Sequence, residues 1–347
     1  MKAIHLDAIG VVSVQEVPDP TVESPTDVVV DVIATTICGS DLHLVGGHMG
    51  GETGYVLGHE YVGVVREVGG AVREFQVGDR VIGPPAPWCG NCDHCRAGKA
   101  AYCRHGGVLG AGKTFGGFGG TQAQRLRVPF GDRDLVRVPD HVTDAAALGV
   151  GDALMTGATG ARHACTGIGQ AIAVFGCGPI GLMAIHYAAA LGASTIIAID
   201  PVTKRLELAK QLGATHTISA LDPRSEVGAI TGGRGVDGVV DAAGVAATFA
   251  AALDVLAPCG RLAVLGIPGE PFEFQVAAAL FKTVDLWTGL GDIRMVDELM
   301  ALVAAGKLDP SPVFNGEFTL DEVPELYRRL AAPGHGIVKA LIRPNEA

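Results

Sequence analysis

The stretch AIAVFGCGPIGLMAIHYAAALGASTIIAID, residues 171–200, decides the fold of this chain. It contains two short apolar runs, Ala171–Phe175 and Thr195–Ile199, separated by a glycine-rich turn and a segment of helical length, Leu182–Leu191. This order predicts a strand, a turn, a helix and a second strand. The stretch carries no Asp, Glu, Lys or Arg before its last residue, but the turn interrupts it, so we predict no membrane span. Because both strands are apolar on both faces, they are typical of a buried parallel sheet.

The turn carries the pattern Gly-x-Gly-x-x-Gly, formed by Gly176, Gly178 and Gly181, and Asp200 ends the second strand. In a dinucleotide-binding fold the first glycine permits the tight turn, the second lets a pyrophosphate approach the helix N-terminus, and the third lets helix and strand pack closely. A carboxylate about 20 residues further on accepts hydrogen bonds from the adenosine ribose. The same carboxylate would repel a 2′-phosphate, so the sequence favours NAD. Arg205 keeps NADP open as the alternative, because a nearby cation could bind that phosphate.

The sequence on either side of this stretch predicts two domains of different character. Downstream, strand and helix patterns alternate and complete an α/β domain over residues 153–293. The segments concerned are Gly238–Asp241, Ala246–Leu256 and Gly260–Gly266. Upstream, short apolar runs interrupted by glycine and proline predict a strand-rich domain over residues 1–152, to which residues 294–347 return.

A cluster of four cysteines predicts a structural metal site. Cys89, Cys92, Cys95 and Cys103 can close a tetrahedral shell of thiolates around zinc, within a lobe that spans residues 86–105. An iron–sulfur cluster is the competing interpretation, because Cys-x2-Cys-x2-Cys begins like a ferredoxin motif. The spacing to the fourth cysteine and the absence of a following proline disfavour it.

A second group predicts a metal site that is open to chemistry. Cys38, His59 and a carboxylate would supply only part of a tetrahedral shell and leave one position free. Glu60 adjoins His59, and it either lies behind the metal or replaces a water transiently as a ligand. We favour the first of these roles for Glu60.

Composition and charge limit the classes of function. The chain has 347 residues and a formal charge of -11 without a basic block, which argues against nucleic acid as a partner. The N-terminal segment Met1–Asp7 reaches a charge before the apolar core of a signal sequence could form, so we expect a cytoplasmic protein. Thiols stay reduced in that compartment, which favours metal binding over disulfides for the clustered cysteines.

In order and spacing, these motifs resemble those of the zinc-dependent alcohol dehydrogenases of the medium-chain dehydrogenase/reductase family, over nearly the whole chain. Cys38-Gly-Ser-Asp-Leu-His43 resembles the first zinc-ligand loop of the family, Gly58-His59-Glu60 the second, and the cysteine lobe its structural zinc site. The segment Asp152–Gly157 resembles the part that supplies a third protein ligand. Gly119–Gln124 is similar to the branch that includes formaldehyde, threonine and bacterial secondary-alcohol dehydrogenases. The resemblance implies a GroES-like catalytic domain and a Rossmann domain with a doubly wound parallel sheet.

The resemblance also implies two zinc ions per subunit and roles for the residues near one of them. Cys38, His59 and Asp152 would bind the catalytic zinc in a formally neutral site. A zinc-bound alkoxide would transfer hydride to NAD. Ser40 would accept the proton of the alcohol, and a ribose hydroxyl of the cofactor would pass it to His43, because histidine titrates near working pH.

Further contacts to the cofactor are implied in the same way. They would come from Ile180, Leu265, Gly266, Ile267 and Leu290, beside Gly176, Gly178, Gly181, Asp200 and Arg205.

We therefore expect an NAD-dependent oxidoreductase that interconverts an alcohol, by preference a secondary one, and its ketone or aldehyde. A polyol, threonine-like amino-alcohol or formaldehyde dehydrogenase of the same family is the alternative. Outside the enzymes, the alternative is a catalytically inactive binding protein on this fold. The expected partners are a small-molecule alcohol or ketone and further copies of the chain, with a tetramer favoured over a dimer. We expect no nucleic-acid partner and no membrane association.

Overall fold

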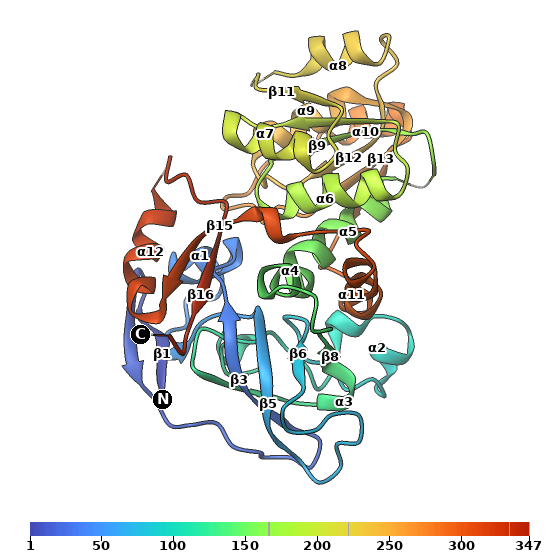
Figure 1. Cartoon of the computed structure of the whole chain (residues 1–347). Coiled ribbons are helices and arrows are strands. Elements are labelled where there is room, and N and C mark those ends of the chain that lie inside the picture. The colour runs from blue at the N-terminus through green and yellow to red at the C-terminus, as the bar shows by residue number, and fades with distance from the viewer. Residues whose placement is uncertain (166, 221, 333, 347) are drawn as a thin grey trace. The chain divides into compact units, whose positions relative to one another are not determined.

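The computed structural model describes residues 1–165, 167–220, 222–332 and 334–346. These residues form two compact units, which we describe separately. The two-segment unit comprises Met1–Asp152 and Asp292–Ala347, and the single-segment unit comprises Ala153–Gly291. Figure 1 shows the helices and strands of both and labels them where there is room.

The single-segment unit is built on one six-stranded sheet in which every neighbouring pair is parallel. The strand order is β11-β10-β9-β12-β13-β14. The strands are β9 (Ala171–Phe175), β10 (Thr195–Ile199), β11 (His216–Ile218), β12 (Val236–Asp241), β13 (Leu256–Val264) and β14 (Asp285–Thr288). The order of strands reverses between β9 and β12, which is the switch point where ligands bind in sheets of this kind. The parallel sheet predicted from the two apolar runs is thus confirmed.

Helices cover both faces of this sheet (Figure 1). The helices are α5 (Met155–Ala164), α6 (Pro179–Ala190), α7 (Thr203–Gln211), α8 (Arg224–Ile230), α9 (Ala246–Val255) and α10 (Val276–Lys282). Alternate residues of each strand face opposite ways: Ala173 and Val239 pack in the cluster that contains α8 and α9, while Val174 and Val240 lie against α6 and α5. The arrangement is the predicted doubly wound Rossmann fold.

The two-segment unit is rich in strands, as the GroES-like resemblance implies. Its larger sheet has seven strands in the order β15-β16-β3-β5-β6-β8, with β7 paired to β3, and a second sheet has the order β2-β1-β4. The bounds are β1 (Lys2–Ala8), β2 (Val11–Glu16), β3 (Val28–Thr35), β4 (Tyr55–Val56), β5 (Tyr61–Val68), β6 (Arg80–Ile82), β7 (Arg125–Val128), β8 (Val136–Arg137), β15 (Phe314–Thr319) and β16 (Lys339–Arg343). The C-terminal strand β16 therefore lies beside β3 from the N-terminal segment.

Short helices connect these strands. They are α1 (Gly39–Val45), α2 (Asp93–Arg96), α3 (Gly131–Asp134), α4 (Asp144–Gly149), α11 (Val296–Ala304) and α12 (Val323–Ala331), with the π-helical turn Val150–Leu154 and the 3-10 turns Ala100–Tyr102, Lys113–Phe115, Ile293–Met295, Ser311–Val313 and Leu320–Glu322. Within the described part of the chain, we find no helix with the length and apolar character needed to cross a membrane.

Candidate active site

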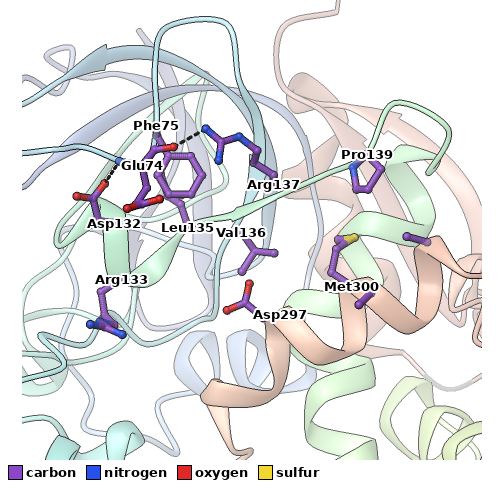
Figure 2. A pocket seen from close by; sticks show the side chains of 12 residues that line it. Glu74, Phe75, Asp132, Arg133, Leu135, Val136, Arg137, Pro139, Asp297 and Met300 are labelled. Carbon is purple, nitrogen blue, oxygen red and sulfur yellow. Dashed lines mark hydrogen bonds between the residues drawn. The ribbon is translucent and has the colours of Figure 1, made fainter.

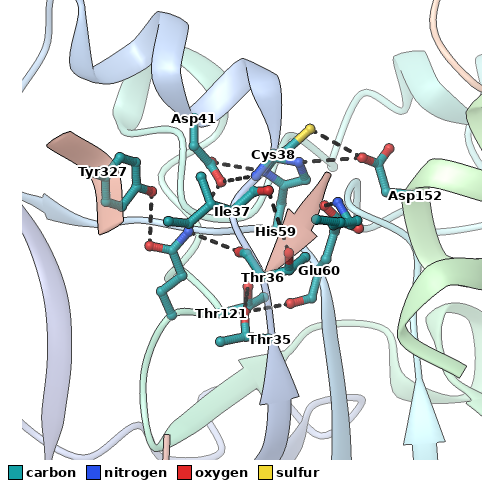
Figure 3. A network of polar contacts seen from close by, with 12 residues as sticks. Thr35, Thr36, Ile37, Cys38, Asp41, His59, Glu60, Thr121, Asp152 and Tyr327 are labelled. Atoms are coloured by element: carbon teal, nitrogen blue, oxygen red, sulfur yellow. Dashed lines mark hydrogen bonds and ion pairs between the residues drawn. The ribbon is translucent and has the colours of Figure 1, made fainter. Parts of the chain in front are cut away.

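Four side chains of the two-segment unit bring metal-binding atoms together (Figure 3). Cys38 is the N-cap residue of α1, His59 and Glu60 directly precede β5, and Asp152 lies in the π-helical turn. One ligand atom from each of the four lies within 4.8 Å of the others. The Cys38 sulfur is 3.4 Å from Oδ2 of Asp152, and Nε2 of His59 is 3.7 Å from the same oxygen.

These separations suit a zinc ion. Ligand atoms that lie about 2.0 to 2.3 Å from zinc in a tetrahedral shell are separated by about 3.4 to 3.8 Å from one another. The distances from Asp152 to Cys38 and His59, 3.4 and 3.7 Å, fall in that range. A thiolate, an imidazole and a carboxylate are also the chemical types that catalytic zinc sites use. Cys38, His59 and Asp152 therefore fit the metal that the sequence predicts.

The electrostatics of these side chains favour a cation. Burial lowers the pKa of His59, but the carboxylates of Asp41 and Asp152 outweigh it and raise the pKa well above its usual value. Burial raises the pKa of Asp152, and His59 more than offsets this effect and brings the pKa to about 2. Burial and the charge of Asp152 raise the pKa of the Cys38 thiol. The site thus holds negative charge that either a proton on His59 or a metal ion can balance.

Asp41 joins two residues of the candidate metal site to a buried polar network (Figure 3). Its Oδ1 lies 3.3 Å from Nδ1 of His59, and its Oδ2 accepts hydrogen bonds from the N–H of Cys38 at 2.9 Å and from Nε2 of Gln122 at 3.1 Å. The Tyr327 hydroxyl in turn donates to Oε1 of Gln122 at 2.9 Å. Such outer partners orient metal ligands and raise their basicity.

Glu60 forms an ion pair inside the protein. Its Oε1 accepts a hydrogen bond from Nζ of Lys339 at 2.7 Å, and the two residues are 1% and 3% exposed. Burial raises the pKa of Glu60, Lys339 opposes this effect, and the resulting pKa is about 7. For Lys339, burial lowers the pKa, but Glu60 outweighs it and raises the pKa above its usual value.

The two residues predicted to move a proton lie on α1. Ser40 and His43 are both half-buried, and residues three apart on a helix share a face. The imidazole ring of His43 meets that of His48 edge to face, with 5.7 Å between the ring centroids. Burial, and then the charge of His48, lower the pKa of His43. A lowered pKa keeps this imidazole unprotonated, and so able to accept a proton, at neutral pH.

The four clustered cysteines also fit zinc. The sulfur atoms of Cys92 and Cys95 are 3.4 Å apart, those of Cys89 and Cys103 3.5 Å, and those of Cys92 and Cys103 4.0 Å. A tetrahedral shell with Zn–S bonds of about 2.3 Å requires about 3.8 Å between sulfurs. None of the four cysteines is in a disulfide.

Backbone N–H groups favour the thiolate form in this lobe. Cys103 accepts N–H bonds from Cys89 and His105, and Cys92 accepts one from Cys95. Hydrogen bonds from the backbone of Arg104 and Cys95 lower the pKa of Cys92 to about 6, whereas burial raises the pKa of Cys95 to about 12. A metal ion would remove the need for protons on such closely spaced sulfurs.

In the single-segment unit, the three glycines of the turn differ in what surrounds them. Gly176 has φ +82°, a region that favours glycine. A Cβ on Gly181 would lie 1.8 Å from the carbonyl oxygen of Gly176, so helix and strand meet closely there. A Cβ on Gly178, the N-cap residue of α6, would meet no protein atom within 4 Å. The space beside Gly178 suits a pyrophosphate at the helix N-terminus.

Asp200 is almost fully buried at the end of β10 and is held by the glycine turn. Its Oδ2 accepts a hydrogen bond from the N–H of Cys177 at 2.8 Å, and its Oδ1 accepts one from Val202 at 2.8 Å. The Nη1 atom of Arg205 lies 3.6 Å from Oδ2. The carboxylate and the cation that bear on the choice between NAD and NADP are therefore neighbours.

The other predicted cofactor contacts follow strand ends of the same sheet or begin α6. Leu265, Gly266 and Ile267 come directly after β13, and Leu290 comes shortly after β14. Ile180 lies in the first turn of α6. Ile267 and Leu290 are exposed. Because the carboxyl ends of parallel strands share one edge, these residues lie along the edge where ligands bind in this fold.

A surface hollow of about 700 Å³ in the two-segment unit lies apart from these residues (Figure 2). Two of its polar side chains have partners: Asp132 accepts the N–H groups of Arg73 and Glu74, and Arg137 pairs with Asp79. It contains none of the residues predicted to bind metal or cofactor.

Four residues that contact or support the candidate metal ligands are absent from the predicted site. They are Asp41, Gln122, Tyr327 and Lys339. Asp41 lies inside the motif Cys38–His43 and Gln122 inside Gly119–Gln124. Their place in these motifs was the signal that could have identified them. Tyr327 and Lys339 belong to the C-terminal segment, and the sequence carries no local sign of their role.

Comparisons with protein families give two matches along the chain. Residues 24–140 match the alcohol dehydrogenase GroES-like domain, and residues 179–305 match the family of zinc-binding dehydrogenases.

Individual proteins resemble the chain over its whole length. An alcohol dehydrogenase of Cupriavidus necator is 32% identical over 372 residues, which cover 99% of each protein. The structure of an alcohol dehydrogenase from Thermus sp. ATN1 aligns with a TM-score of 0.93 and 38% identity, covering 99% of each chain. A zinc-binding dehydrogenase of Sinorhizobium meliloti, solved bound to NADP, aligns with a TM-score of 0.87 and 30% identity, again covering 99% of each chain.

Proposed function

Because this chain belongs to the zinc-dependent alcohol dehydrogenases of the medium-chain dehydrogenase/reductase family, we propose that it catalyses reversible hydride transfer between an alcohol and NAD. The observation that carries the proposal is the meeting of Cys38, His59 and Asp152 at zinc-ligand distances. A catalytically inactive binding protein is the weaker proposal, since this donor set is retained.

When bound, zinc supplies a Lewis acid that makes an alcohol oxygen more acidic and polarises a carbonyl. Cys38, His59 and Asp152 would hold this ion, and Asp41 would fix the imidazole of His59 through its Nδ1. Cys89, Cys92, Cys95 and Cys103 would hold the second, structural ion.

Ser40 and His43 would move the proton. Ser40 Oγ would accept it from the alcohol, and His43 would receive it by way of a ribose hydroxyl of the cofactor and release it to water. Their positions on one face of α1 and the lowered pKa of His43 support this role.

The cofactor would lie along the carboxyl edge of the parallel sheet. The N–H groups at Gly178 and the start of α6 would bind the pyrophosphate, and Asp200 would accept ribose hydroxyls. Asp200 favours NAD, although the neighbouring Arg205 and the NADP-bound relative keep NADP as the alternative.

The proposed substrate is a secondary alcohol, with polyols, threonine-like amino alcohols and formaldehyde as the alternatives. We further propose that the chain forms a homo-oligomer, with a tetramer favoured over a dimer. We also propose that it is cytoplasmic, because thiols remain reduced there and available for zinc.

The test is NADH formation from secondary alcohols, diols, threonine and formaldehyde, on protein whose zinc content has been measured. We expect turnover with two zinc ions per chain, and loss of turnover in Cys38→Ser. Cys259→Ser is the matched control, because Cys259 is exposed and belongs to neither metal group. Absence of both NAD and NADP binding by the zinc-loaded chain would rule out the proposal.

A further inference from the structure

Lys339 is a buried lysine whose partner lies in the candidate metal site. Lys339 is 3% exposed and Glu60 1%, and Nζ and Oε1 are 2.7 Å apart. Removing two charges from water is costly, and a buried pair that loses one partner is strongly destabilised. A lysine placed here therefore acts chiefly on the carboxylate that it contacts.

The sheet fixes both members of this pair. Lys339 is the first residue of β16, which pairs with β3 through Ile342 and Thr35. Thr35 also pairs with Tyr61 at the start of β5, and its hydroxyl donates to the carbonyl oxygen of Glu60 at 2.8 Å. Lys339 thus begins one strand that flanks β3, and Glu60 directly precedes the other, so neither backbone can move far without breaking the sheet.

The second oxygen of Glu60 is the unusual feature. Oε2 is buried and has no hydrogen-bond partner in the part of the chain that the structure describes. Glu60 is also one of the four residues whose ligand atoms lie within 4.8 Å of one another. A carboxylate in this position is within reach of the metal site.

The charges indicate what Lys339 changes. Zinc with Cys38, His59 and Asp152 is formally neutral, whereas Glu60 as a fourth protein ligand would leave one negative charge and fill the open position. Lys339 neutralises the charge of Glu60 without the metal ion, and its ammonium group binds one oxygen of that carboxylate.

We propose that Lys339 is a positioning residue that holds Glu60 outside the metal coordination shell and thereby keeps one position open for substrate. The inference rests on the proposed function, because it presumes a metal ion at Cys38, His59 and Asp152.

The test replaces zinc by cobalt(II) at the Cys38 site of the full chain and retains zinc in the cysteine lobe. The visible bands of tetrahedral cobalt(II) change when the ligand in the fourth position is exchanged, so added imidazole should shift the bands of the wild-type chain by binding at the open position. In Lys339→Met we expect shifted bands that imidazole no longer changes, because Glu60 fills that position, and in Lys339→Arg we expect the wild-type spectrum and the wild-type response. If Lys339→Met does not fold, Lys339→Gln, which keeps a hydrogen-bond donor without the charge, should lose the response to imidazole as well.

A double variant separates this role from a general effect on structure. Glu60→Gln/Lys339→Met contains no unpaired buried charge, and its spectrum should equal that of Glu60→Gln, because the proposed effect of Lys339 on the metal ligands requires the carboxylate of Glu60. Two results would overturn the inference: a wild-type spectrum in Lys339→Met and Lys339→Gln, or a change caused by Glu60→Gln while Lys339 is intact, which would mean that Glu60 is already a ligand. A wild-type chain that takes up no cobalt at Cys38 would instead overturn the proposed function.

Discussion

Among single residues, Asp41 has the widest influence on the candidate metal site. One carboxylate contacts His59, Cys38 and Gln122 at once. In Asp41→Asn the negative charge beside Nδ1 of His59 is lost, and we expect zinc affinity to fall about 10- to 100-fold. The measurement is the competition between the Cys38 site and a chelator of known affinity.

Tyr327→Phe provides a graded control for this prediction. It removes only the outermost hydrogen bond of the network, from Tyr327 to Gln122. A neutral hydrogen bond contributes about 0.5 to 1.5 kcal/mol, so the loss of affinity should be smaller than in Asp41→Asn. Equal effects of the two variants would show that Asp41 has no special role in holding the ligands.

His43 and His48 lead to a prediction about pH. The pKa of His43 is lowered by burial and then by the charge of His48. The groups packed around α1 from other elements include Tyr55 and Tyr327, which are neutral near pH 7. In His48→Gln we expect the pKa of His43 to rise toward its ordinary value, measured by NMR titration of the imidazole.

The lowered pKa of His43 also predicts how the stability of the fold changes with pH. A histidine with a lowered pKa binds its proton more weakly in the folded state, so stability rises with pH between that lowered pKa and about 6.5, and is unaffected above it. The His48→Gln variant should narrow this window. His216→Gln, a substitution in β11, is the control, and an unchanged titration of His43 in His48→Gln would mean that burial alone sets its pKa.

The residues of the site show what the sequence could reveal. The thiols and His59 were predicted from motifs, because metal ligands need particular chemical types at particular spacings, whereas Asp152 was predicted from the resemblance to the family. Lys339 contacts Glu60, which is 279 positions away in the sequence. Neither the residue type of Lys339 nor the sequence around it predicts that contact. Long-range pairing across β16, β3 and β5 creates it, and such pairing has no local signature.

At the scale of elements, the connection from β9 to α6 is the most informative. The predicted helix begins at Leu182, but α6 begins at Pro179, so Gly181 is inside the helix. A proline is favoured in the first turn, because its missing N–H is not needed there. The strands β9 and β10 were predicted with their observed bounds, because an apolar run between a turn and a charge has few other interpretations.

Two glycines of this connection should respond differently to substitution. Gly181→Ala places Cβ 1.8 Å from the carbonyl of Gly176, and we expect a loss of about 1 to 3 kcal/mol in the free energy of unfolding. Gly178→Ala meets no protein atom within 4 Å and has φ -73°, so its stability should change by less than about 1 kcal/mol.

Gly178→Ala, which should hardly affect stability, should instead affect cofactor affinity. If the space beside Gly178 receives the pyrophosphate, Gly178→Ala should weaken NAD binding about tenfold, or about 1.4 kcal/mol. Calorimetric titration with NAD and denaturant unfolding measure the two effects. Unchanged NAD affinity in a stable Gly178→Ala variant would contradict the assignment of the binding site.

At the scale of the whole molecule, each predicted ligand belongs to one unit. Both groups of candidate metal ligands lie in the two-segment unit, whereas the glycine turn and Asp200 lie in the single-segment unit. Each unit also has its own apolar clusters, one around β9 and α9, and others around β3 and β5 and around β1 and α12. A ligand that binds only the folded state stabilises the structure that holds it.

Amide hydrogen exchange should therefore show zinc and NADH protecting different segments of the chain. Removal of zinc by a chelator should speed exchange first in the lobe from Cys89 to Cys103, whose short helix α2 has little apolar core of its own. NADH at about 100 times its Kd should slow exchange in β9 and the start of α6, since it adds about 2.7 kcal/mol to the opening free energy there. Exchange in β9 that follows the chelator, with the lobe unchanged, would contradict the assignment of zinc to the cysteines, because a structural metal acts on the segment whose thiolates it joins.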